Sequence, residues 1–283
     1  MLEAENFMIL IVCSFWRDNA AQAEQLLEFI FAQNDRQQLK AHILLVNAPT
    51  VDKELTERIK ISAELAFAGV YQLELRPLAD ERAPKWKQIN NAFTQAATHI
   101  HKTFRWPFLW MDPDCVPTRR GWHSRLVLEY GSQPKAYLGS RMKISAAGKP
   151  DMFLMARNGI YPVNAITDVP AAEAPYEIAS AVNVFPKFNS TKIFQQALLA
   201  NESDLVSVRP EAVMVHGDKN GFLRRQLEAS FTPEEVAPSV IAVASEAPAA
   251  SESVPITQPK RRGGRPSKAE LANRLARLNG NPK

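Results

Sequence analysis

Two aspartates lie two positions apart at the end of an apolar run, and their type and spacing favour metal chemistry. Residues 106–116 read WPFLWMDPDCV, so Asp112 and Asp114 follow a segment with the character of a buried strand. Open α/β sheets bind ligands in the crevice at the carboxyl ends of their strands, so both carboxylates are expected to face a ligand. Mg²⁺ and Mn²⁺ prefer oxygen ligands and commonly lie between carboxylates and substrate phosphates. The alternative is a solvated turn, because Asp and Pro are ordinary turn residues.

The segments before the aspartates alternate between strand-like and helix-like patterns. Strands are predicted over residues 7–13, 41–46 and 70–75, and helices over 21–31, 52–67 and 84–101. Asp52 gives the second helix an acidic start, and Pro84 suits a first helical position. Strands that alternate with helices of this length imply right-handed βαβ units. The sequence therefore predicts an α/β fold with a mixed, mostly parallel sheet flanked by helices.

Around these aspartates the chain resembles the nucleotide-sugar glycosyltransferases of the GT-A type, whose hallmark is an Asp-x-Asp motif. Residues 85–92 read KWKQINNA and are similar to the family's Lys-x-x-x-Leu-Asn-x-Ala helix start. After a short apolar stretch, residues 216–221 read HGDKNG and resemble the family's late His beside a basic phosphate contact. The three motifs occur in the family's order. The resemblance implies a GT-A-like, Rossmann-type domain, which we place at residues 1–231.

The resemblance also implies a role for each matched residue. Asp112, Asp114 and His216 would hold Mn²⁺ or Mg²⁺, and Lys219 would contact the phosphates of a nucleotide sugar, expected to be a UDP-sugar. A departing nucleoside diphosphate gains negative charge in the transition state, so a cation and a nearby ammonium would stabilise it. Asp114 and Lys219 are therefore the predicted catalytic residues. Without the aspartates, His216 would read as a histidine in a surface turn.

Further donor contacts are predicted from the loop after the first strand and from the start of the third helix. Besides Asp112, these residues are Ser14, Trp16, Arg17, Lys85 and Asn90. An aromatic side chain in that loop can stack on a nucleotide base or pack against a helix. Lysines at the start of an amphipathic helix usually form a solvated face, and only the resemblance raises Lys85 above that interpretation.

The half of the domain after the aspartates has a less regular pattern. Residues 136–144 and 151–157 are predicted to form a hairpin that turns at Gly148, and residues 188–200 have helical spacing. In the resembled family, the acceptor site and any general base come from this half. Three carboxylates are available there, and no motif selects among them or distinguishes inversion from retention: Asp168, Glu173 and Glu177.

The C-terminal residues have a different composition. Residues 232–259 are rich in Ala, Pro, Ser, Val and Glu and contain no Lys or Arg, which predicts a flexible, disordered linker. Residues 260–268 read KRRGGRPSK and resemble an AT-hook, an extended element that lies in the DNA minor groove. A Gly replaces the first Arg of the usual Arg-Gly-Arg-Pro core, which weakens A·T selectivity more than DNA binding. The predicted DNA contacts are Lys260, Arg261, Arg262, Arg265 and Lys268.

The charge distribution agrees with this division. Residues 260–283 hold eight Lys or Arg and one Glu, a net charge of +7 in a chain whose total is +4. Such a tail binds phosphates with an affinity that falls as salt rises, and Arg favours the negative potential of a narrow minor groove. The alternative is a solubilising basic tail that ends in a short helix over residues 269–278.

Length and cysteine content permit an intracellular enzyme. The 283 residues suffice for one sizeable domain, and two Cys are too few for a disulfide framework. The sequence shows no signal-peptide pattern and no apolar run near 18 residues, so a soluble cytoplasmic protein is expected, without a membrane partner. If the protein is viral, the location would be the host cytoplasm.

Together these features favour a metal-dependent glycosyltransferase that moves a sugar from a nucleotide-sugar donor to double-stranded DNA. The expected acceptor is a hydroxymethylpyrimidine base, because DNA glycosylation of that kind is typical of bacteriophages. One alternative is a glycosyltransferase with a protein or polysaccharide acceptor. The other is a non-catalytic, DNA-tethered module that binds nucleotide sugars.

Overall fold

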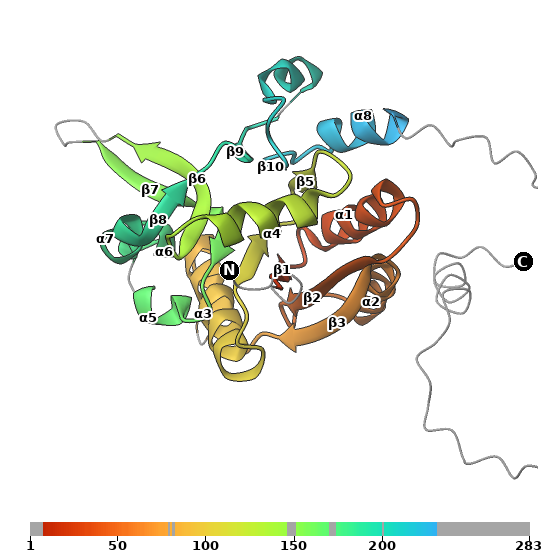
Figure 1. Ribbon diagram of the computed structural model, residues 1–283. Coiled ribbons are helices and arrows are strands. Elements are labelled where there is room, and N and C mark those ends of the chain that lie inside the picture. The colour runs from red at the N-terminus through yellow and green to blue at the C-terminus, as the bar shows by residue number, and fades with distance from the viewer. Residues whose placement is uncertain are drawn as a thin grey trace, which may run out of the picture.

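The computed structural model describes residues 8–78, 80, 83–145, 151–169, 174–199 and 201–230 (Figure 1). The predicted linker, the basic tail with its five DNA contacts, Gly148 and Glu173 lie outside the described residues. Within the described part, no helix is long and apolar enough to cross a membrane.

The N-terminal half alternates strands and helices up to the aspartates, as predicted. Its elements are β1 (Leu10–Phe15), α1 (Ala20–Gln33), β2 (Leu39–Asn47), α2 (Lys53–Ala66), β3 (Phe67–Glu74), α3 (Lys85–Thr103) and β4 (Phe108–Met111). The carboxylate of Asp52 caps α2 by accepting a hydrogen bond from the Leu55 backbone at 3.0 Å. Pro84 occupies the N-cap of α3, one position before the predicted one.

The second half combines longer elements with several of only three or four residues. They are β5 (Cys115–Pro117), α4 (Trp122–Ser132), β6 (Tyr137–Ile144), β7 (Met152–Tyr161), α5 (Ala165–Asp168), α6 (Tyr176–Ala179), α7 (Ala181–Val184), β8 (Phe188–Ser190), β9 (Phe194–Gln196), β10 (Met214–His216) and α8 (Phe222–Ser230), with 3-10 helices at Phe185–Lys187 and Glu202–Ser207. The predicted pairing of β6 with β7 is confirmed as antiparallel. This hairpin projects from the body of the molecule (Figure 1).

The helix predicted over residues 188–200 is wrong. That segment contains two strands, because β8 pairs with β6 and β9 pairs with β10. A helix would place Phe194 and Leu198 on one apolar face, yet Phe194 is buried and Leu198 is 71% exposed. The free edges of two sheets offered backbone hydrogen bonds that the local pattern does not reveal, so tertiary pairing overrides helical spacing.

The central sheet has seven strands in the order β3-β2-β1-β4-β7-β6-β8. β1 pairs in parallel with β2 on one side and with β4 on the other, and β3 extends the parallel set. Among the described strands of this sheet, only β7 runs in the opposite direction. A second sheet has the order β5-β10-β9 and begins directly after the aspartates. The aspartates therefore lie where the chain passes from the large sheet to the small one.

Alternation along β1 and β4 separates two hydrophobic cores. Ile11 of β1 and Leu109 of β4 belong to the core that includes α1, α2 and α4. Val12 and Trp110, one position later, belong to the core that includes α3. Successive strand residues point to opposite faces, so both faces of the central strands are covered and β4 is fixed from two sides (Figure 1).

Asp168, a predicted candidate base, instead joins three elements. Its carboxylate accepts hydrogen bonds from the Tyr137 hydroxyl at 2.8 Å and from Lys187 Nζ at 2.6 Å, and its carbonyl accepts one from Asn183. We expect Asp168→Asn to lower the free energy of unfolding by about 1–3 kcal/mol, because an amide cannot accept from both donors. Urea unfolding would measure this loss. Asp151→Asn, at an exposed ion pair with Lys143, is the control, and equal stability of the two variants would contradict the assignment.

Candidate functional site

Asp112 is held rigidly at the end of β4. Its backbone N–H donates to Asn158 Oδ1 at 3.0 Å, and the Trp110 indole donates to its Oδ1 at 3.1 Å. The thiol of Cys115 donates to the same Asn158 oxygen at 3.1 Å. Asn158 lies on β7, which is hydrogen-bonded to β4, so the two strands fix the turn together. The carboxylate is thus oriented before any ligand arrives.

The small sheet places His216 beside both aspartates. β10 pairs with β5 in an antiparallel register that sets His216 opposite Cys115. Its Nε2 lies 3.1 Å from Asp114 Oδ1 and 3.5 Å from Asp112 Oδ2. Its Nδ1 donates to Gln196 Oε1 on the neighbouring strand β9. That bond fixes the ring so that Nε2 faces the carboxylates.

The surroundings keep Asp114 ionised. Burial would raise the pKa of Asp114, but the hydrogen bond from His216 and the charges of His216 and Arg157 outweigh it and lower that pKa. Its carbonyl accepts hydrogen bonds from the backbone of Gly217 at 3.2 Å and of Asp218 at 3.1 Å. The loops that follow β4 and β10 are therefore joined through Asp114.

The three predicted ligands fit a divalent cation. One ligand atom each from Asp112, Asp114 and His216 lies within 4.8 Å of the others. Two carboxylate oxygens and one imidazole nitrogen are ligands that Mn²⁺ accepts, and oxygens suit Mg²⁺. Gln196 behind His216 and Trp110 behind Asp112 supply the outer hydrogen bonds that orient metal ligands.

Sequence reasoning missed Arg157, which lies on β7 and contacts the same cluster. Its Nε and Nη2 each lie 2.9 Å from Asp112 Oδ2, and its Nε lies 3.9 Å from Glu177 Oε1. Burial would lower the pKa of Arg157, but the charges of Asp112 and Glu177, together with the neighbouring tyrosines, outweigh it and raise that pKa, so the side chain stays cationic. The available signal was an Arg inside the apolar run of β7, because a buried Arg requires a partner.

Glu177, another predicted candidate base, lies behind Arg157 on α6. Burial raises the pKa of Glu177, and the charge of Arg157 only partly offsets this effect. Of the two candidate carboxylates that the structure describes, Glu177 is the one that lies next to Arg157, whereas Asp168 is bonded to Tyr137 and Lys187. Glu173 lies outside the described residues.

A pocket of about 250 Å³ opens beside the cluster. It is lined by Trp16, Asp18, Asn19, Gln22, Lys85, Ile89, Asp112, Asp114, Arg157 and Lys219. Lys85 Nζ lies 2.7 Å from Asp18 Oδ2 across this pocket, and Lys219 is held through its carbonyl, which accepts from Gln22 at 2.7 Å. Three cations from separate parts of the chain, Lys85, Arg157 and Lys219, thus line the pocket that contains the aspartates, which is an arrangement suited to a polyanion.

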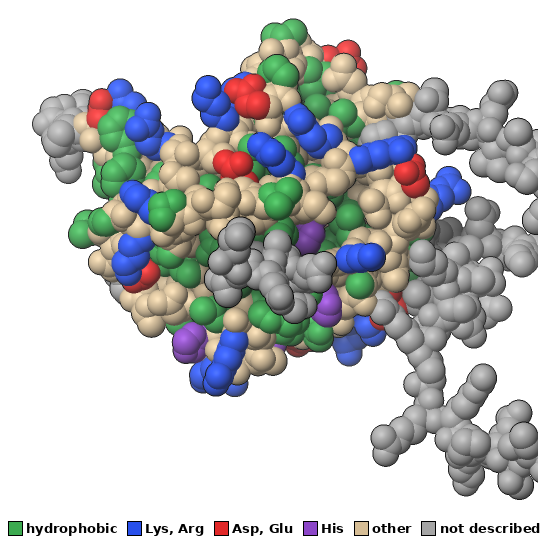
Figure 2. Space-filling model, in the orientation of Figure 1, with side chains coloured by type: hydrophobic (Ala, Val, Ile, Leu, Met, Phe, Trp, Pro, Cys, Tyr) green, Lys and Arg blue, Asp and Glu red, His purple; other side chains and the backbone are tan. Residues whose placement is uncertain are grey.

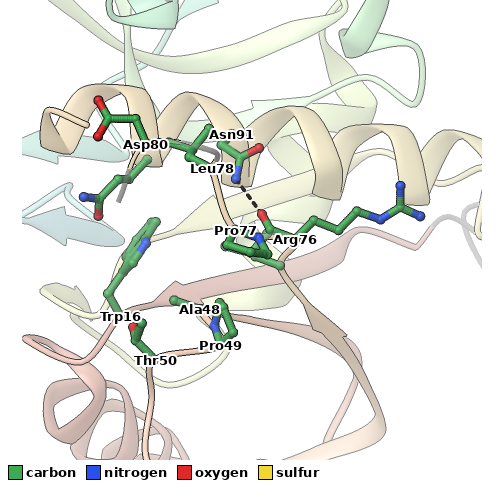
Figure 3. A pocket seen from close by; sticks show the side chains of 11 residues that line it. Trp16, Ala48, Pro49, Thr50, Arg76, Pro77, Leu78, Asp80 and Asn91 are labelled. Carbon is green, nitrogen blue, oxygen red and sulfur yellow. Dashed lines mark hydrogen bonds between the residues drawn. The ribbon is translucent and has the colours of Figure 1, made fainter. Parts of the chain in front are cut away.

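A second pocket of about 480 Å³ lies on the other side of Trp16. The ends of β2 and β3 and the start of α3 line it, with Ala48, Thr50 and Asn91 among its residues. Figure 3 shows the Trp16 ring extending from the loop after β1 into this pocket, while the Arg76 side chain points away. Trp16 lines both pockets, so the two pockets adjoin at its side chain.

The structure places the remaining predicted donor residues elsewhere. Ser14 is buried inside β1, and Arg17 is exposed outside both pockets. The amide of Asn90 donates to the Ala174 carbonyl at 2.8 Å and accepts from the Tyr176 backbone at 3.0 Å. Asn90 therefore anchors the segment that carries Glu177. Its amide does not line either pocket.

The chain matches no protein-family model, and no curated protein matches it. Its fold resembles that of solved glycosyltransferases. The apo structure of the bifunctional glycosyltransferase WbbM is 12% identical with a TM-score of 0.50, over 76% of this chain and 46% of that chain. The galactosyltransferase LgtC, solved with donor and acceptor sugar analogs, is 9% identical with a TM-score of 0.46, over 80% and 98%. GlyE of Streptococcus pneumoniae TIGR4 is 10% identical with a TM-score of 0.46, over 81% and 61%.

The likeness to WbbM extends to less than half of that chain, and at 12% identity it concerns the fold. The mostly parallel seven-stranded sheet flanked by helices is the architecture that the sequence predicted. The chain has a GT-A-type fold.

Gly217 is required for the position of His216. Its φ is +111°, and an added Cβ would lie 1.9 Å from the Ala197 carbonyl oxygen. We expect Gly217→Ala to destabilise the protein by about 1–3 kcal/mol and to weaken Mn²⁺ binding, because β10 must move. Thermal unfolding and Mn²⁺ titration would measure both effects. Gly131→Ala in α4, where a Cβ meets nothing within 4 Å, is the control, and identical behaviour of the two variants would refute this role.

Proposed function

We propose that this chain is a metal-dependent glycosyltransferase that uses a nucleotide-sugar donor. The observation that carries the proposal is the cluster of Asp112, Asp114 and His216 at the carboxyl end of a central strand, beside a cation-lined pocket. Open α/β sheets bind ligands at that edge. The GT-A-type fold agrees with this assignment.

Each of the two pockets would bind a different part of the nucleotide-sugar donor. The nucleoside would occupy the larger pocket against Trp16, and the diphosphate would lie in the smaller pocket beside the aspartates. Lys219, which lines the smaller pocket, would donate to the diphosphate as the bond to the sugar breaks, when the negative charge of the diphosphate is greatest. A bound Mn²⁺ or Mg²⁺ would neutralise the same charge as a Lewis acid.

The acceptor that we propose is a hydroxymethylpyrimidine base in double-stranded DNA, and the support for it is the basic sequence at 260–268. Figure 2 shows Lys and Arg side chains spread over the face that carries α4, with acidic side chains among them. Two arginines at α4 and just before it have acidic partners: Arg120 lies 2.6 Å from Asp35, and Arg125 lies 3.7 Å from Glu129. Binding of the DNA backbone is therefore assigned to the tail.

The function is tested by incubating the protein with a panel of nucleotide sugars and with unmodified or hydroxymethylated DNA. Mass spectrometry of the nucleosides should then show a hexose or pentose added only to the hydroxymethylated base. We expect Asp114→Asn to lower the rate by about 100-fold or more, since it removes a metal ligand, while Asp151→Asn transfers normally. Transfer that continues in excess chelator would contradict metal dependence. Donor hydrolysis without DNA modification would instead indicate a protein or polysaccharide acceptor.

The tail should matter for long DNA but not for the chemistry. The predicted linker of 28 residues has a span of roughly 25–35 Å, so a bound tail would raise the concentration of bases near the site. Truncation before Lys260 should weaken duplex binding and slow transfer to long duplexes by about tenfold or more at low salt. Donor hydrolysis should stay at the full-length rate. Equal modification of long DNA by both proteins at low salt would remove the support for DNA as acceptor.

A further inference from the structure

Two side chains, those of Arg157 and His216, approach the same oxygen of Asp112. Oδ2 accepts a hydrogen bond from Arg157 Nε at 2.9 Å and lies 2.9 Å from Arg157 Nη2, and it is also the Asp112 oxygen that lies 3.5 Å from His216 Nε2. The other oxygen, Oδ1, is held by the Trp110 indole. A divalent cation bound between Asp112 and His216 would therefore share Oδ2 with a permanent positive charge.

The guanidinium of Arg157 also has N–H donors that do not contact Asp112. Arginine offers five N–H groups in a planar fork, and the contacts with Asp112 involve Nε and Nη2. Within the described part of the chain, the hydrogen bonds and ion pairs of the guanidinium do not involve Nη1. Arg157 lines the 250 Å³ pocket together with Lys219, and we assign this pocket to the diphosphate.

We propose that Arg157 couples the binding of the metal to the binding of the diphosphate. Alone, the fixed cation competes with Mn²⁺ for Asp112 and weakens metal binding, since like charges at close range repel. A nucleoside diphosphate bridges both cations with its oxygens and removes this repulsion. Metal and diphosphate then raise each other's affinity by the same factor. This inference rests on the proposed function for the identity of the anion, but not for the competition at Asp112.

The effect of Arg157 is separable from the orientation of Asp112. Without the guanidinium, Asp112 keeps the hydrogen bond from Trp110 to its carboxylate and the one from its backbone to Asn158. Removing the charge of Arg157 should therefore strengthen metal binding. If Arg157 only held Asp112 in place, its removal would weaken metal binding, so the sign of the change distinguishes the two roles.

The test measures Mn²⁺ binding by electron paramagnetic resonance of the free ion, with and without saturating UDP. Arg157→Gln should bind Mn²⁺ alone about tenfold more tightly than the wild type, and UDP should improve that affinity far less than it does in the wild type. Arg157→Lys keeps the charge and should retain weak metal binding. Arg141→Gln on β6, where Arg141 lies over the Phe153 ring, is the matched control and should behave as the wild type.

The measured affinities distinguish coupling by the charge of Arg157 from a role in which Arg157 only positions Asp112. Unchanged or weaker Mn²⁺ binding by folded Arg157→Gln would overturn the proposal, as would equally tight binding by Arg157→Lys. Absence of Mn²⁺ binding in every protein would overturn it too. If Arg157→Gln tightens Mn²⁺ binding but UDP binds to no protein, the competition at Asp112 stands and the proposed donor fails.

Discussion

Two carboxylates held close together at the end of a buried strand are the constraint on which the rest of the structure depends. Two neighbouring negative charges with little exposure are costly unless cations and hydrogen-bond donors surround them. Arg157, His216 and Trp110 provide these partners, each from a different part of the chain. The site is therefore arranged around Asp112 and Asp114 before any ligand binds.

The pairing of the strands brings these partners to the aspartates. β7 runs against the parallel strands next to β4, and this pairing brings Asn158 and Arg157 to Asp112. The small sheet brings His216, which is distant in the sequence, next to the aspartates. Helix α8 closes the same region, because Asp218 caps its first turn and Arg224 donates to the Pro113 carbonyl at 3.2 Å. The turn between the aspartates is thus fixed by segments more than forty residues away.

Trp16 lies where the two pockets meet. It forms part of both pockets, so the larger pocket adjoins the one that contains the aspartates. Its backbone N–H donates to Asn19 Oδ1 at 2.7 Å, which shapes the loop between β1 and α1. In the function that we propose, the larger pocket would hold the nucleoside of the donor and the smaller pocket its diphosphate.

The sequence by itself determined the alternation of strands and helices and the position of two aspartates at a strand end. Both follow from spacing along the chain, which fixes the faces of each element. It also indicated His216 and Lys219, but only through a resemblance.

Tertiary structure decided which side chains contact one another in the candidate site. Arg157 binds Asp112 although the two residues are 45 positions apart in the sequence. Gln196 orients His216 from an adjacent strand. The Asn90 side chain accepts a hydrogen bond from the backbone of Tyr176. The segment at 188–200 became two strands because unpaired sheet edges lay beside it. Such contacts depend on the order and register of strands distant in sequence, and local patterns carry no information about either.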